Sequence, residues 1–155
     1  MRIAAVLGAV VLALHPFITH AADEPPIGRV KRVTGTVLLD RAGKTLPVTP
    51  GMPLQTGDRI RTGADGLVGV TLADDTLLSA GKGSRLLINE FRFDTRTHEG
   101  GMLATLSQGS LHVVTGLIAK KAPEKVNFRT PSTVLGVRGT DFIVEVPAGA
   151  AEAAL

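Results

Sequence analysis

The chain of 155 residues contains no cysteine, no tryptophan and no tyrosine. Without cysteine there is no disulfide, no thiol nucleophile and no thiolate metal site, so burial alone must hold the fold together. Without tyrosine and tryptophan the chain lacks the aromatic platforms on which sugars and bases most often stack. That absence counts against a carbohydrate-binding groove.

Long apolar runs are absent after the N-terminal segment. There, Arg2 precedes the twelve-residue apolar run from Ile3 to Leu14, and Thr19-His20-Ala21 places small residues where a signal peptidase cleaves. This pattern predicts a signal peptide at residues 1–21 and an exported protein. The alternative is an uncleaved membrane anchor, but a span needs roughly 20 apolar residues and His15-Pro16 interrupts this run.

Neither sign of charge is in large excess. The chain has 17 Lys and Arg against 14 Asp and Glu, and loss of Arg2 with the signal peptide leaves 16 against 14, a net charge of +2. Nucleic-acid surfaces need clustered basic residues, so we expect no nucleic-acid partner. Lys120, Lys121 and Lys125 surround Pro123, and a solvated loop is favoured there over a binding patch. No membrane span is expected after cleavage.

The rest of the chain alternates apolar and polar residues between closely spaced turn residues. This period of two, punctuated by glycine and by turns such as residues 40–43, is typical of half-buried strands. Only part of residues 100–110 approaches a helical period. The pattern predicts an all-β fold of short antiparallel strands, either a sandwich, a roll or a short stack of β-coils. The predicted inward sets are Val33, Val37 and Leu39; Val68, Val70 and Leu72; Leu87, Phe91 and Phe93; Leu111 and Val113; and Phe142, Val144 and Val146.

Residues for catalysis or metal binding do not form a recognisable arrangement. Only His98 and His112 follow the predicted signal peptide, and His112, between two inward residues, is expected to be exposed on a strand. No serine lies in a Gly-x-Ser-x-Gly elbow, and Gly81 to Ser84 lacks the spacing of a phosphate loop. Asp74 and Asp75 indicate a turn. We therefore expect no catalytic residue, no metal site and no cofactor.

Five short motifs follow one another in a fixed order. They are "TGTV", "GDRIRTG", "GVTLADDTLLSAGKGSRLLI", "LSQGSLHV" and "FRTPSTVLGVRGTDFIVEV". Together they resemble the FecR domain, an exported β-rich domain best known as the periplasmic part of anti-sigma regulators in iron-transport signalling. The expected organisation is a signal peptide (1–21), a linker (22–29), a single compact FecR-like domain (30–146) and a flexible tail (147–155). The resemblance implies a periplasmic location.

The resemblance also assigns individual positions, most of them expected to be structural. Asp75 stands where the family often has glycine, and aspartate tolerates the left-handed turn. The guanidinium of Arg138 is expected to donate hydrogen bonds to the carboxylate of Asp58 or Asp141. This structural function is favoured over that of an exposed anchor for a partner. The matching residues are Gly57, Asp58, Thr62 and Gly63; Leu106, Gly109 and Leu111; Thr130 and Pro131; and Arg138, Gly139, Thr140 and Phe142.

Two departures from the family pattern shape the expected function. The FecR-like part follows the predicted signal peptide directly, without the cytoplasmic segment that holds a sigma factor. Family members usually continue with further strands, whereas this sequence ends at Leu155. The last strand is therefore expected to have an unpaired edge, through truncation or because a partner, or a second copy in a homodimer, supplies the next strand. The residues of this predicted edge are Phe142, Ile143, Val144, Glu145 and Val146.

The sequence thus favours a non-catalytic periplasmic protein-interaction or scaffold module in cell-envelope signalling, with an envelope protein as its partner. Two alternatives stay open. One is a module that binds peptidoglycan or another envelope polysaccharide, which the missing aromatic platforms make weaker. The other is a truncated fragment of an anti-sigma regulator.

Overall fold

The structure, a computed structural model, describes residues 25–138 and 141–150. The predicted signal peptide, the first residues of the predicted linker, Gly139, Thr140 and residues 151–155 lie outside the described residues. No helix within the described ranges is long and apolar enough to cross a membrane.

Twelve strands make up most of the described chain, with one short α-helix and one 3₁₀ turn. All-β architecture is therefore confirmed. The elements are β1 (Gly28–Thr34), β2 (Val37–Arg41), β3 (Lys44–Pro47), β4 (Pro53–Leu54), β5 (Arg59–Thr62), β6 (Leu67–Leu72), β7 (Leu77–Ala80), β8 (Arg85–Phe93), β9 (Gly100–Val114), α1 (Leu117–Lys121), η1 (Pro123–Lys125), β10 (Val126–Arg129), β11 (Val134–Gly136) and β12 (Asp141–Val146).

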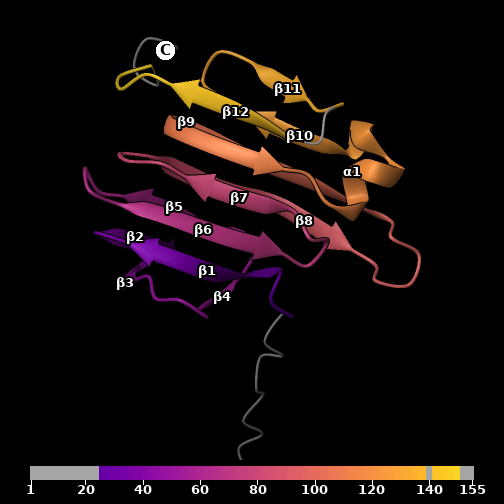
Figure 1. Cartoon of the computed structure of the whole chain (residues 1–155), viewed down its shortest axis with the longest axis horizontal. Helices are drawn as coiled ribbons and strands as arrows, with labels where there is room; N and C mark the ends of the chain where they lie inside the picture. The colour runs from indigo at the N-terminus through magenta and orange to yellow at the C-terminus, as the bar shows by residue number, and fades with distance from the viewer. Residues whose placement is uncertain (1–24, 139–140, 151–155) are drawn as a thin grey trace, which may run out of the picture.

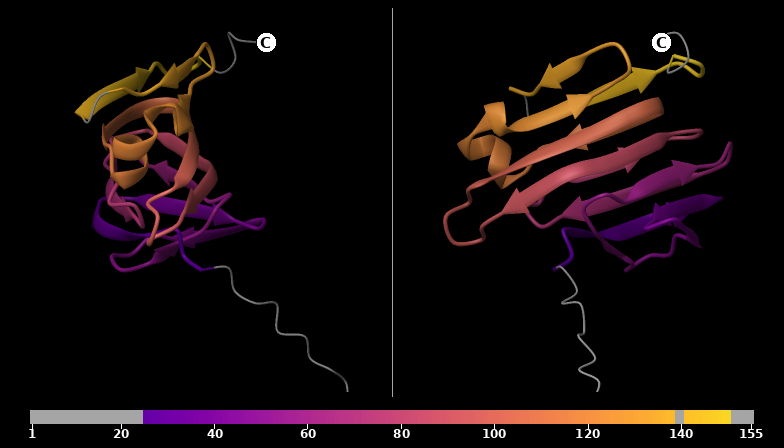
Figure 2. Two further views of the ribbon diagram at one scale, coloured as in Figure 1. Left: turned by 90° about the vertical axis from the view of Figure 1, so that its right-hand side faces the viewer. Right: turned by 180° about the vertical axis from the view of Figure 1, so that it is seen from behind.

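The strands form two sheets that share the long strand β9. Sheet A runs in the order β4-β1-β6-β7-β9-β12, where β12 pairs with residues 109–114 of β9. Sheet B runs in the order β3-β2-β5-β8-β9-β10-β11, where β8 and β10 flank the first part of β9. Figures 1 and 2 show the strands stacked from indigo to yellow, nearly in chain order. The fold is an antiparallel sheet curled into a half-barrel, with β9–β10 as the one parallel pair among the described strands.

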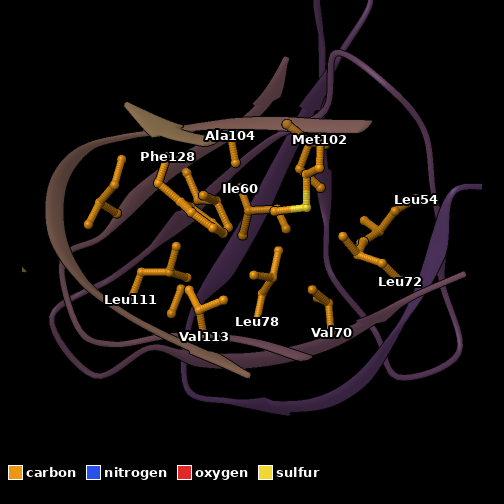
Figure 3. Close-up of a cluster of buried hydrophobic side chains, with 14 of the residues drawn as sticks. Leu54, Ile60, Val70, Leu72, Leu78, Met102, Ala104, Leu111, Val113 and Phe128 are labelled. Carbon is orange, nitrogen blue, oxygen red and sulfur yellow. The ribbon is translucent and has the colours of Figure 1, made fainter. Parts of the chain in front are cut away.

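The core fills the space between the two sheets. In Figure 3, Val70, Leu78 and Val113 from sheet A point toward Met102, Ala104 and Phe128 from sheet B. Three of the predicted inward sets are confirmed, because Val68, Val70 and Leu72, then Leu111 and Val113, then Val144 and Val146 are all buried, with Phe142 half-buried. Among the described residues, every buried side-chain nitrogen or oxygen has a hydrogen-bond partner.

The segment from Val33 to Leu39 is not one strand. The chain leaves β1 in sheet A at Thr34 and enters β2 in sheet B at Val37. Gly35 makes the corner with φ +62°, and a Cβ there would lie 2.3 Å from the Asp65 carbonyl oxygen. Val37 and Leu39 are buried as predicted, whereas Val33 belongs to the other sheet and is only half-buried.

Strand β8 has a different inward set from the predicted one. Leu86 and Ile88 are buried, and Leu87 faces outward. A β-bulge between Ile88 and Glu90 then reverses the alternation, so that Phe91 returns to the core. A simple period of two cannot anticipate this extra residue.

Two further segments differ from the expectations. Residues 100–110, the closest approach to a helical pattern, lie in β9, the longest strand. The predicted loop around Pro123 contains α1 and η1, and Val126–Arg129 forms β10, which runs parallel to β9. Ile118 of α1 is fully buried, so this segment closes the end of the core.

Candidate functional site

The motif residue Asp58 is a buried anchor. Its carboxylate accepts hydrogen bonds from Arg41 Nε (2.7 Å), Arg41 Nη2 (2.6 Å) and the Gln55 backbone N–H (2.8 Å). Arg41 also donates to the Pro53 carbonyl, and its hydrogen bond to Asp58 raises the pKa of the guanidinium. Together these contacts tie the β2–β3 hairpin to the turn before β5. Sequence reasoning missed Arg41, because no local spacing connects it with Asp58.

The motif residues Thr62 and Gly109 meet at the corner where β9 passes from sheet B to sheet A. Thr62 Oγ1 donates to the Gly81 carbonyl (2.6 Å) and accepts from the Ser84 N–H (2.7 Å). Ser84 Oγ donates to the Ser110 carbonyl and accepts from the Ser110 N–H, both at 3.0 Å. Gly109 lies against this network with φ +90°. The Gly63 carbonyl oxygen accepts hydrogen bonds from the Gly66 and Gly83 N–H groups. These motif residues therefore have a structural function at this corner of the fold.

The remaining motif residues that lie in turns also have structural functions. Thr130 Oγ1 accepts from the Thr133 N–H (3.2 Å), which makes a tight turn with Pro131 between β10 and β11. Asp75 has φ +67°, as expected for aspartate in place of glycine. Gly57 has φ +88° in an open turn, where a Cβ would meet nothing within 4 Å.

Arg138 does not bind either of its two expected carboxylates. Asp58 is engaged by Arg41, and Asp141 hydrogen-bonds the ring of His112. Asp58 is fully buried, whereas Arg138 is exposed beside β12. Within residues 25–138 and 141–150, no ion pair involves the Arg138 side chain.

Strand β12 has one paired and one unpaired edge among the described strands. Its paired edge adds to β9, from Asp141 opposite Val114 to Val146 opposite Gly109. Val144 and Val146 point into the core, while Ile143 is 65% exposed on the outer face of sheet A. No described strand pairs with the other edge of β12.

A groove runs along this unpaired edge, between β11 and β12. Its volume is about 480 Å³. Phe142, one of its lining residues, is half-buried and meets Phe128 edge to face, with ring centroids 5.3 Å apart. The groove is mostly apolar, with Arg138 and Glu145 as its charged residues. Its lining residues are Leu135, Gly136, Val137, Arg138, Phe142, Ile143, Val144 and Glu145.

His112 lies on a strand with its side chain 44% exposed, so it is less open to solvent than expected. It lies on the outer face of sheet A, opposite Ser79 and Ile143 in the register, and it hydrogen-bonds Asp141 from the neighbouring strand. Within the described ranges, no group of three or more His, Asp or Glu side chains is arranged to hold a metal ion.

An ion pair between Asp40 and Arg61 ties β2 to β5 on the outer face of sheet B. Arg61 Nε donates to Asp40 Oδ2 (2.7 Å), and this bond, with one from Thr45 Oγ1, lowers the pKa of Asp40 from 3.8 to about 2. A carboxyl group whose pKa is depressed in the folded state stabilises the fold at pH values above its ordinary pKa of 3.8. This stabilisation is lost as the pH falls from 3.8 to about 2.

We therefore expect Asp40→Asn to flatten the fall in melting temperature between pH 4 and pH 2, which circular dichroism melts across that range measure. Asp75→Asn, in an exposed turn, is the control and should leave the slope unchanged. Equal slopes in wild type and Asp40→Asn would contradict the prediction.

Comparison with known proteins gives the family to which this curled β-domain and its motif turns belong. A family model described as FecR protein matches residues 58–155, more than half of the chain. The chain therefore belongs to the FecR family, a family of cell-envelope signalling regulators that is not known for enzymatic activity. No curated protein and no solved structure matches the chain significantly.

Proposed function

We propose that this protein is a non-catalytic periplasmic scaffold of envelope signalling, which binds a partner protein by strand addition at β12. The observation that supports it is the unpaired β12 edge beside an apolar groove. Exposed strand edges template the pairing of another chain, and natural proteins rarely leave an apolar one bare. Main-chain hydrogen bonds would give affinity, and the groove would give specificity.

The side chains of β12 indicate the partner's chemistry. On its outer face, Ile143 lies between Asp141 and Glu145, so the strand offers an apolar centre between two acidic residues. An incoming strand with an apolar residue flanked by Lys or Arg complements it, since opposite charges on facing strands stabilise a pair. Arg138 then lies at the groove to receive an acidic or carbonyl group.

A second copy of the chain fits this edge less well. In an antiparallel pair that places Ile143 opposite itself, Asp141 of each copy would face Glu145 of the other. Like charges directly opposite destabilise a sheet. We therefore propose a different envelope protein as the partner, and a homodimer is an alternative outcome of the experiment.

A photo-crosslinking amino acid at Ile143 tests this function in cells of the native host. We expect a discrete adduct in the periplasmic fraction, larger than the chain and different from its dimer. Glu145→Lys should lower the adduct yield by up to about fivefold, the value of one opposite-charge strand pair.

The control places the same crosslinker at Leu67, which is exposed on the outer face of sheet A but lies on β6, three strands from β12. Equal adducts from both positions, or none from Ile143, would show that β12 is not the interaction edge. An adduct with the mass of two chains would replace the partner protein by a second copy.

A further inference from the structure

The outer face of sheet B concentrates positive charge. Its strands bear Arg59, Arg61, Arg85, Arg92 and Arg129, and exposed Lys125 directly precedes β10. The acidic residues on the strands of this face are Asp40 and Glu90. On the strands alone, five basic against two acidic residues leave an excess of three, equal to the +3 of the entire chain.

The strand registers bring these residues together from distant parts of the sequence. Arg61 lies directly opposite Arg85, so two guanidinium groups face each other across neighbouring strands. Arg129 of β10 lies opposite Thr105, which lies opposite Leu87 and then Arg59 in the same row. Like charges in adjacent positions oppose sheet formation. The juxtaposition of Arg61 and Arg85 therefore opposes the pairing of β5 with β8.

Most of these charges have no partner within the protein. Arg61 is held by Asp40, at 2.7 Å. Among the described residues, the side chains of Arg85, Arg92, Lys125 and Arg129 make no hydrogen bond and no ion pair. Their donors are therefore available to an external anion.

A hollow of about 610 Å³ lies among them. Arg92, Lys125 and Arg129 line it together with Gly101 and Leu103, and Glu90 is its one carboxylate, so the lining carries three positive charges against one negative. A Cβ on Gly101 would meet nothing closer than the Lys125 carbonyl oxygen at 3.5 Å, an ordinary contact. The strand itself therefore does not demand glycine at this position, and the missing side chain keeps the hollow open.

We propose that this basic face binds an acidic polysaccharide, with carboxylate groups of the polymer on Arg92, Lys125 and Arg129 and a sugar ring over Gly101 and Leu103. The charges extend over β5, β8, β9 and β10, about 15 Å at the usual strand spacing, so the ligand is multivalent and extended. A membrane surface fits less well, because Val134 is the one large apolar side chain exposed on this face among the described residues. This site is separate from the β12 edge and does not depend on the proposed partner protein.

Calorimetric titration of the mature protein with polygalacturonate tests the site. We expect binding that weakens as sodium chloride rises, because salt screens exposed charges. Arg92→Glu with Arg129→Glu should weaken binding about tenfold or more, since each removes a charge-assisted contact. Gly101→Val should also weaken binding, without any change in charge, by filling the hollow.

The matched control is Lys31→Glu with Arg32→Glu, which gives the same net charge but alters exposed residues of β1 in sheet A. An equal loss in this control would mean that binding follows overall charge, and the proposal would fail. It would also fail if neutral dextran binds equally, if polygalacturonate does not bind, or if phosphatidylglycerol vesicles bind and the polymer does not. Circular dichroism melts check that each variant is folded.

Discussion

Gly109→Ala is expected to lower the free energy of unfolding by about 2–5 kcal/mol, because it combines a strained backbone with a steric overlap. Gly109 has φ +90°, and a Cβ there would lie 2.4 Å from Ser84 Cα and 2.3 Å from Ser84 Oγ. The backbone at Ser84, which directly precedes β8, cannot move away without breaking the hydrogen bonds between Ser84 and Ser110. Chemical denaturation of the purified mature protein measures the loss.

Gly51→Ala separates the two causes. Gly51 has φ +87°, nearly the same as Gly109, but a Cβ there would meet nothing within 4 Å. It should cost only about 1–2 kcal/mol, the penalty of the left-handed conformation alone. If both variants lose the same stability, the close contact at the β9 corner contributes nothing and the prediction is wrong.

Asp58→Asn is expected to cost about 2–3 kcal/mol. The substitution keeps the shape of the side chain but removes the charge that holds the Arg41 guanidinium at 2.6 Å. Breaking a fully buried ion pair costs about 3–5 kcal/mol, and the side chain of Arg41 is 25% exposed, so water recovers part of this. Thermal and urea unfolding of the variant measure the effect.

Asp40→Asn is the matched control for Asp58→Asn, since it removes a carboxylate from a bidentate arginine pair on the protein surface. Both partners of the Asp40–Arg61 pair are partly exposed, and surface pairs contribute little. Its loss of stability should be much smaller than that of Asp58→Asn. A loss as large at Asp40 would show that burial does not decide the strength of these pairs.

Much of the fold was predictable because its strands alternate locally. Val68, Val70 and Leu72 are buried as a set, since every second residue of a strand faces the same side. The left-handed turn at Asp75 was also predictable, because aspartate tolerates this backbone conformation. The bulge at Asn89 and the corner at Gly35 were not, because each depends on which distant strand the segment meets.

The two surfaces proposed to bind ligands were less predictable than the core. The resemblance to the family indicated that β12 is an edge strand. The sequence also predicted that Arg138 binds Asp58 or Asp141, but Arg41 is the residue that binds Asp58. The basic face was invisible in the sequence, where Arg61, Arg92 and Arg129 are widely separated and the net charge is small. Register between distant strands creates this cluster, and no local pattern encodes register.

Strand β9 belongs to both sheets and therefore joins them covalently. Its first part pairs with β8 and β10 in sheet B, and its second part pairs with β7 and β12 in sheet A. A change in the twist of β9 would therefore be transmitted to both sheets at once. A strand added at the unpaired edge of β12 would lie one strand away from this shared element.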